Sequence, residues 1–559
     1  MTPPRPTPQP DAGTGRPLRG DRIHRYVNAF CPACHHEDPE RDLVHVRRLS
    51  GWLVERQGRI WLERGCPDHG LVRTLYDERP DILRYLEEWT APTKSHVPDL
   101  TGNFAPVPAA YLDGLPEMQT QHTCILLEDI TEHCNLRCPT CFADSAPPLQ
   151  GVAPVEAVLA NVDARLERED GRLDVLMLSG GEPTLYPELE RLLDELVSRP
   201  VVRILVNTNG LTIARDDALV DLLRRHRKRV EIYLQYDGSS AEASLHHRGG
   251  DLRSHKDRAI ARLSEAGVFT TLTMTAALGV NDDEIGDVIT RALDTPFVCG
   301  VSIQPIFGSG RTGHIDATDR LTHTGVLARM GPQTGGVVSW RDLTALPCSH
   351  PHCASVGYLL KDDSDTWRSL TGIVGHDQLK QWLDLAPESF ANRITDQALP
   401  EQMRTVVKEA VLGLLSEQTS LSHPQVGDLW KAVCQTCDLG LPTLTTLVTS
   451  RLPGQHERLR RLMGERIKRI SVKPFMDIET MIEERLTQCC VHVGTRGASG
   501  EQCAPFCAVQ AWAPLSRQKI GVGPVAKGAG RVSLPDPVVG EGPAREDVSG
   551  GGASRAPAH

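Results

Sequence analysis

The chain has 559 residues, a formal net charge of −11 and 16 cysteines. Its length predicts about two to four domains, and the negative charge argues against a nucleic-acid partner. No run approaches the roughly 18 apolar residues of a membrane span. Residues 1–22 lack the apolar core of an export signal, so we expect a cytoplasmic protein. Where thiols stay reduced, this many cysteines indicates metal ligands rather than disulfides.

Four candidate metal ligands lie near the N-terminus, in the runs CPAC and CPDH: Cys31, Cys34, Cys66 and His69. A C-x2-C pair with a later cysteine and histidine can form a tetrahedral zinc site, or a rubredoxin-like iron site if a fourth thiolate joins. Cys124 is a possible fourth thiolate. The sequence therefore predicts one mononuclear site and leaves zinc and iron open.

The run ITEHCNLRCPTCF carries Cys134, Cys138 and Cys141 in a loop after a predicted strand at 124–130. Three thiolates can hold three irons of a cubane [4Fe–4S] cluster and leave the fourth iron open to a small chelating ligand. An open position is typical of a catalytic rather than a structural metal site. A zinc knuckle or an ordinary four-cysteine cluster is the alternative interpretation.

Strand and helix patterns alternate through the middle of the chain. Such alternation implies an α/β fold with a parallel sheet and outer helices, and right-handed crossovers would curl the sheet into an open barrel. The predicted strands are 124–130, 174–179, 202–207, 230–236, 268–276 and 299–306, and the predicted helices lie near 154–168, 187–198, 214–228, 253–266 and 282–293.

Polar residues end several of these strands, where the chemistry of such barrels lies. The second strand ends in the run SGGEPTL, which contains Gly180, Gly181, Glu182 and Pro183. Later strands end in Asn207 and Asn209, in Gln235 and Asp237, and in Gln304. Asn-Gly and Asp-Gly pairs also form turns for backbone reasons alone, so each of these later residues has a structural alternative.

Eight cysteines follow the predicted barrel, which is the number that two fully ligated four-cysteine clusters require. Their pairing cannot be deduced from sequence, and one cluster plus a zinc site or free thiols is the alternative. They are Cys348, Cys353, Cys434, Cys437, Cys489, Cys490, Cys503 and Cys507. The remaining Cys124 and Cys299 lie in apolar strands, where cysteine behaves as a small hydrophobe.

The cysteine triplet followed by SGGEPTL resembles the radical S-adenosylmethionine (SAM) superfamily. The resemblance implies a partial (β/α)6 barrel in which SAM chelates the open iron and is cleaved reductively to a 5′-deoxyadenosyl radical. The residue before the third cysteine is usually aromatic but is Thr140 here, so Phe142 is the expected adenine contact. The implied SAM-binding residues are Phe142, Gly180, Gly181, Glu182, Pro183, Asn207, Asn209, Gln235, Asp237 and Gln304.

Four runs in order, CPAC…CPDHG, CNLRCPTCFADS, PCSHPHC and ERLTQCCVH…PFC, resemble one branch of this superfamily. It contains the tetraether lipid synthases and the methanogen enzymes that methylate a pterin. Membership implies one or two auxiliary [4Fe–4S] clusters, the N-terminal metal and an electron donor such as flavodoxin or ferredoxin. We therefore expect C-methylation of a small molecule. Coupling of lipid alkyl chains, or a non-catalytic iron–sulfur carrier or scaffold, is the alternative.

These patterns divide the chain into five parts. We expect disordered tails at 1–22 and 516–559, a zinc-ribbon or rubredoxin-like region at 23–120, a radical SAM partial barrel at 121–335 and an auxiliary-cluster domain at 336–515. No general acid or base is assignable beyond the guesses Asp144 and His492. The basic stretch 458–470 either meets an anionic substrate or forms a solvated helix face.

Overall fold

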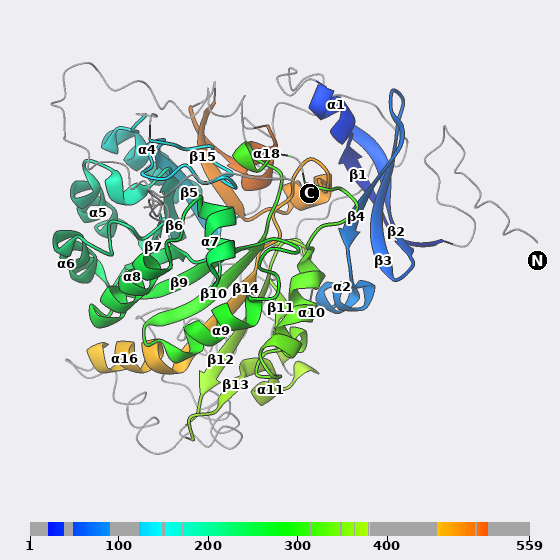
Figure 1. Ribbon diagram of the computed structural model, residues 1–559. Coiled ribbons are helices and arrows are strands. Elements are labelled where there is room, and N and C mark those ends of the chain that lie inside the picture. Colours follow the sequence, from blue (N-terminus) through cyan, green and yellow to red (C-terminus); the bar gives the residue numbers. More distant parts are fainter. Residues whose placement is uncertain are drawn as a thin grey trace, which may run out of the picture.

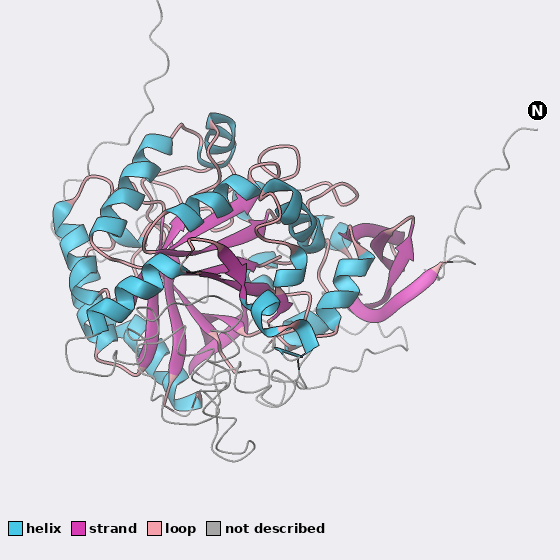
Figure 2. Cartoon of the chain, turned by 90° about the horizontal axis from the view of Figure 1, so that it is seen from below, coloured by secondary structure: helices cyan, strands magenta, loops and turns pink. Residues whose placement is uncertain are grey.

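The computed structural model describes residues 21–37, 48–89, 122–147, 151–169, 171–313, 315–346, 349–362, 364–377, 379–380, 456–497 and 500–512. They form a small antiparallel sheet beside a large, mostly parallel sheet with helices on its outer face (Figure 1). Figure 2 shows the small sheet projecting from one side of the larger body.

The N-terminal sheet is an antiparallel meander in the order β1-β2-β3-β4. Its turn between β2 and β3 consists of Gln57 and Gly58, both with positive φ (52° and 72°), which matches the right-handed twist of a tight hairpin. The elements are β1 (Arg22–Phe30), α1 (Pro32–Glu37), β2 (Arg48–Arg56), β3 (Arg59–Cys66), β4 (Gly70–Asp77) and α2 (Pro80–Glu87).

The six predicted barrel strands are present, and neighbours along the chain pair in parallel. Their apolar side chains and those of the outer helices form one continuous core. The strands are β5 (Ile125–Thr131), β6 (Leu173–Gly180), β7 (Val201–Thr208), β8 (Val230–Gln235), β9 (Thr270–Ala276) and β10 (Val298–Pro305). The helices between them are α4 (Val155–Arg168), η2 (Pro183–Leu185), α5 (Leu189–Val197), α6 (Asp217–His226), α7 (Ala241–Arg248), α8 (Arg253–Glu265) and α9 (Ile285–Asp294).

The C-terminal part of the chain extends the barrel sheet at both edges. β14 (Ile467–Val472) pairs in parallel with β10, and β15 (Val491–Gly497) pairs in parallel with β5. The full strand order is β11-β12-β14-β10-β9-β8-β7-β6-β5-β15-β16, with β13 beside β12. The other elements are η3 (Gly310–Thr312), α10 (His323–Gln333), η4 (Trp340–Asp342), β11 (Thr344–Ala345), β12 (Ser355–Lys361), β13 (Trp367–Ser369), α11 (Leu370–Val374), α16 (His456–Arg466), α17 (Glu483–Thr487), β16 (Gly500–Pro505) and α18 (Phe506–Ala511).

The predicted α/β barrel fold is therefore confirmed, but α7 was missed. It is a short helix with few apolar residues, and its ends are set by capping. The Ser240 side chain accepts a hydrogen bond from Ala243 N, and Gly249 ends the helix at φ 77°.

The basic stretch 458–470 is neither a solvated face throughout nor an open anion site. Arg460 is buried, donates to the carbonyls of Arg227 and Gly267, and lies 4.4 Å from the ring centre of Phe269. Buried Lys468 donates to the carbonyls of Thr295, Val298 and Gly464. These two cations hydrogen-bond backbone carbonyls of the barrel, and so attach α16 and β14 to it.

Candidate active site

The three cysteines of the CNLRCPTC loop meet the strand-end residues around one pocket at the carboxyl end of the barrel. Cys134, Cys138 and Cys141 form one wall, and the ends of β6 to β10 form the others. Of the ten residues expected to bind SAM, eight line this pocket; they are Phe142, Gly180, Gly181, Glu182, Asn207, Asn209, Gln235 and Gln304. Pro183 and Asp237 are not among its lining residues.

Gly180 and Gly181 allow the end of β6 to touch the backbone that leads into the cysteine loop. A Cβ on Gly180 would lie 2.2 Å from the Thr131 carbonyl oxygen, and one on Gly181 would lie 2.0 Å from that of His133. The close approach permits hydrogen bonds from Gly181 N to Thr131 O (2.6 Å) and from Glu182 N to His133 O (2.8 Å). The two glycines therefore fix the cysteine loop against the strand end.

The Glu182 carboxylate is buried and joins two strand ends. Its Oε1 accepts hydrogen bonds from the hydroxyls of Thr184 and Thr208, both at 2.6 Å, and its Oε2 accepts one from Asn209 N at 2.7 Å. Asn209 then donates its side-chain amide to Asn135 Oδ1 inside the cysteine loop at 2.7 Å. The chain itself thus uses much of the bonding capacity of Glu182, which gives that residue a positioning role.

Arg248, which the sequence prediction missed, is a charged group of the pocket whose side chain is 10% exposed. It is bound to both oxygens of Asp237 (2.6 and 2.7 Å) and to Gln235 Oε1 (2.9 Å), and Gln235 in turn donates to Asn207 Oδ1 (2.9 Å). Burial opposes the charge on Arg248, but Asp237 and the Cys138 thiol beside it hold its pKa above the usual range. Asp237 therefore acts on the pocket through Arg248.

A second cation, Lys256, is buried next to the end of β7. Its ammonium donates to the Asn209 carbonyl at 2.6 Å. Burial lowers its pKa to about 8, while Asp237, Cys138 and Glu182 favour its charged form. Two positive groups thus lie close to thiols that would be negatively charged as ligands.

Phe142 was expected to contact adenine because Thr140 stands at the position that is usually aromatic. Thr140 lines the pocket and its hydroxyl bonds the His247 imidazole (3.0 Å) on α7. Phe142 packs against Phe307 and Phe506, with ring centres 6.0 and 5.7 Å apart. Phe142 and Phe307 line the pocket, so aromatic rings border it.

The two residues guessed as proton-transfer groups have structural partners. Asp144 binds Arg311, which also donates to the carbonyls of Cys138 (2.9 Å) and Ser145 (2.6 Å) and so braces the cysteine loop. His492 is buried, and its Nδ1 lies 2.8 Å from the Thr123 hydroxyl.

The pocket fits the three-thiolate cluster that its sequence predicts. The thiols are buried or half-buried and converge on one space. Burial, with the negative charges of Glu182, Cys138 and Cys141, raises the pKa of Cys134 well above its usual range. Such a set of thiolates requires bound cations close by.

A second cysteine-lined pocket lies behind α18. Its walls contain Cys353, Cys489, Cys490 and Cys507, together with Cys124. Arg485 donates to Cys353 Sγ (3.3 Å), and Met476 N donates to Cys507 Sγ (3.3 Å). Buried, mutually repelling thiols with a cation and N–H donors beside them are suited to an iron–sulfur cluster.

The remaining cysteines lie in different places. Cys503 is buried in the barrel core and does not line this second pocket, whereas Cys124, expected in the core, does. Cys299 lies at the start of β10 and donates to the Thr270 carbonyl. Cys348, Cys434 and Cys437 lie outside the described residues.

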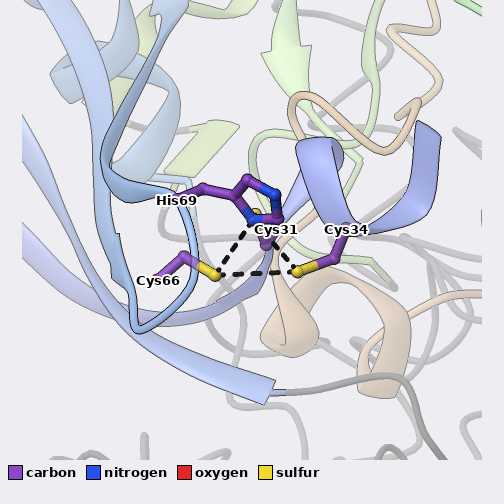
Figure 3. A group of neighbouring side chains, drawn as sticks. All are labelled: Cys31, Cys34, Cys66 and His69. Carbon is purple, nitrogen blue, oxygen red and sulfur yellow. Dashed lines mark hydrogen bonds between the residues drawn. The ribbon is translucent and has the colours of Figure 1, made fainter. Parts of the chain in front are cut away.

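Figure 3 shows the N-terminal group, in which Cys31, Cys34, Cys66 and His69 converge. The His69 Nδ1 lies 3.6, 3.3 and 3.5 Å from the three sulfurs in that order, and the Cys34 and Cys66 sulfurs are 3.6 Å apart. Ligands about 2.3 Å from a central zinc in tetrahedral geometry stand nearly this far apart. Glu37 bonds the other ring nitrogen at 2.8 Å, which fixes the orientation of the imidazole.

Two protein families match the regions that these sites occupy. Residues 129–292 match the radical SAM superfamily, and residues 23–78 match the HMPTM N-terminal zinc ribbon domain. The chain therefore contains a radical SAM domain. These matches confirm the expectation of a radical SAM enzyme, and the family implies a [4Fe–4S] cluster and SAM. No helix in the described part of the chain is long and apolar enough to cross a bilayer.

Relatives match this radical SAM chain over different lengths. The 7,8-dihydro-6-hydroxymethylpterin dimethyltransferase of Methanocaldococcus jannaschii is 24% identical over 515 residues, which cover 88% of this chain and 94% of that protein. The subtilosin biosynthesis protein AlbA of Bacillus subtilis is 26% identical but covers 30% of this chain and 36% of its own length. A solved radical SAM methyltransferase from Sphaerobacter thermophilus is 16% identical, covers 50% of this chain and 72% of its own, and superposes with a TM-score of 0.28.

Proposed function

We propose that this enzyme cleaves SAM reductively and methylates carbon in a small molecule of the pterin class. The proposal is supported chiefly by one observation: three thiols and eight expected SAM-binding residues surround a single pocket. The choice of methylation and of a pterin follows the methanogen dimethyltransferase, which matches nearly its whole length.

Each part of the pocket has a distinct task in this proposal. Cys134, Cys138 and Cys141 hold the cluster, which with SAM bound supplies an electron and a 5′-deoxyadenosyl radical. Asn207, Gln235 and Gln304 present amide groups to polar parts of SAM from the ends of β7, β8 and β10. The buried barrel interior excludes water from a reactive radical.

The buried cations support the electron transfer. Arg248 lies beside Cys138, and Lys256 bonds the backbone of Asn209, which is in turn bonded to the cysteine loop. Positive charge near a cluster stabilises its reduced, more negative form. We assign Arg248 and Lys256 the role of easing reduction of the cluster by an external donor of the flavodoxin or ferredoxin class.

We assign a further [4Fe–4S] cluster to the second pocket, held by thiols among Cys353, Cys489, Cys490 and Cys507. We assign zinc to the N-terminal site, because its four donors match the zinc-ribbon family and one of them is an imidazole. The substrate would enter between the two pockets, where Phe142 and Phe307 line the first and Phe475 and Phe506 line the second. A flat heterocycle can stack or pack edge-on against such rings.

The test is an anaerobic assay of purified enzyme with SAM, a chemical reductant and a reduced hydroxymethylpterin. We expect 5′-deoxyadenosine, and a pterin whose mass rises by one methylene for each methyl group added. Deoxyadenosine without a change in the pterin would retain SAM cleavage but reject the substrate. An isoprenoid or fatty-acyl lipid that loses two hydrogens on coupling would favour the lipid synthase alternative, and no SAM cleavage would favour the carrier.

A further inference from the structure

A second group of convergent ligand atoms lies near the start of β1, about seven residues and roughly 20 Å along that strand from the zinc-ribbon cysteines. The Nε2 atoms of His24 and His352 each lie 3.0 Å from the same oxygen of Glu87, Oε1. All three ligand atoms lie within 4.8 Å of one another. We propose that His24, Glu87 and His352 form a binding site for a divalent transition-metal ion.

The donor set and its spacing suit such an ion. Two imidazoles and one carboxylate bind zinc in several hydrolases and ferrous iron in oxygenases, with further positions open to water. Ligand atoms about 2.1 Å from a metal and at right angles to one another are about 3.0 Å apart. The Glu87 side chain is 20% exposed, which leaves a route for water or another small ligand.

The surroundings of the site favour a neutral histidine and an ionised glutamate. The His352 side chain is 1% exposed, and burial disfavours a positive charge on its ring. The two imidazole nitrogens beside Glu87 favour its ionised form. Glu87 also ends α2, where the helix dipole disfavours a negative charge. Arg25, 3.8 Å away, supplies compensating charge, and a bound cation would add to it.

Two features of the backbone and surroundings position the ligands. His24 lies at a β-bulge, because Ile23 pairs with Val54 and Arg25 with Leu53, which leaves His24 without a partner in the ladder. Bulges redirect side chains and are enriched beside functional sites. Tyr76 bonds the other ring nitrogen of His352 at 2.9 Å, as an outer partner of a metal-bound histidine would.

The position of the site gives the ion a structural task. His24 and Glu87 belong to the N-terminal region, whereas His352 lies beside Cys353 in the loop after the barrel. The ion would therefore connect the zinc ribbon to the wall of the second cysteine pocket. The competing explanation is a hydrogen-bond network alone, in which both imidazoles donate to an ionised Glu87.

Glu87→Gln separates these explanations, because glutamine keeps an oxygen that accepts both hydrogen bonds but removes the anionic metal ligand. Full-length protein, purified anaerobically with its clusters, would be freed of weakly bound metal and equilibrated with Co²⁺. Cobalt retained after desalting would be counted by mass spectrometry. We expect wild type to retain one more equivalent than Glu87→Gln. Asp81→Asn, which changes an exposed carboxylate on the same helix, should match wild type.

Tyr76→Phe provides a second, milder variant that keeps all three ligands. Loss of the hydroxyl should weaken Co²⁺ binding by roughly tenfold or more, the scale of outer-partner substitutions at metal sites. The melting temperature of wild type should rise with Co²⁺ more than that of Glu87→Gln. Equal cobalt content and equal cobalt-dependent melting in wild type and both variants would overturn the proposal.

Discussion

The two cysteine-lined pockets differ in what surrounds their sulfurs. The first combines three thiols with amides and a carboxylate at the strand ends and with an arginine on α7. The second surrounds five thiols mainly with apolar side chains, and its charged groups are Arg485 and Lys473. A site one thiolate short of closing a cluster and rich in hydrogen-bonding groups is built to receive a polar ligand. A site with enough thiolates and few polar groups is suited to enclose the cluster that we propose for it.

The largest expected effect comes from removing a thiol of the first pocket. Cys138→Ala should abolish deoxyadenosine formation, a loss on the order of 10⁶-fold, because the cluster loses a ligand and SAM its anchor. Product analysis by mass spectrometry measures the loss. Cys299→Ala, a thiol remote from both pockets, should keep activity and serves as the control. Substantial SAM cleavage by Cys138→Ala would contradict the assignment of the cluster.

A thiol of the second pocket should separate the two reactions. We expect Cys489→Ala to lose methylated product and part of its iron but to keep SAM-dependent deoxyadenosine formation, because the first pocket does not contain this residue. Mössbauer spectra with and without SAM would count the clusters. Equal loss of SAM cleavage and methylation would show that the pockets are not functionally distinct.

Arg248→Met tests whether charge next to the first cluster matters. The variant should reduce SAM cleavage by about 10²-fold, the scale of losing one preorganised donor, and should make the cluster harder to reduce. Redox titration followed by electron paramagnetic resonance measures the potential. Arg253→Met removes an exposed arginine that pairs with Asp251 and is the matched control. An unchanged potential in Arg248→Met would reject the electrostatic role.

The smallest effect concerns packing rather than chemistry. Gly181→Ala should destabilise the fold by about 2 kcal/mol, because its Cβ would collide with the His133 carbonyl and push the cysteine loop outward. Thermal unfolding measures the change. Gly250→Ala, where no atom lies within 4 Å of the added Cβ, should change stability by less. Similar melting of both variants would mean that the loop moves freely.

The six barrel strands could be predicted because apolar strands carry a strong local signal, and the cysteine and GGEP motifs named many of the residues that line the first pocket. The sequence prediction missed Arg248 because α7 has little hydrophobic periodicity, and its role depends on contacts with Asp237 and Cys138. It also placed Cys124 and Cys503 the wrong way round with respect to the second pocket. Whether a cysteine on a strand faces the core or a pocket depends on which distant segments pair with that strand, and sequence spacing does not contain this information.

The same limit applies to the His24, Glu87 and His352 group. His24 lies at a bulge of β1, Glu87 at the end of a helix and His352 in a loop. Glu87 and His352 are 265 residues apart in the sequence. No local motif joins them. By contrast, the zinc-ribbon ligands come in two short runs on adjacent turns, which is why they could be recognised together.

The placement of β14 and β15 has a consequence for how the protein is made. Both strands come from the last 100 residues of the chain, yet they complete opposite edges of the barrel sheet. A ribosome releases the first six barrel strands well before these two, so the nascent sheet has two open edges that invite pairing with other chains. The barrel sheet is complete only after β14 and β15 have added to it. Delivery of iron and sulfide therefore belongs after these two strands have closed both edges.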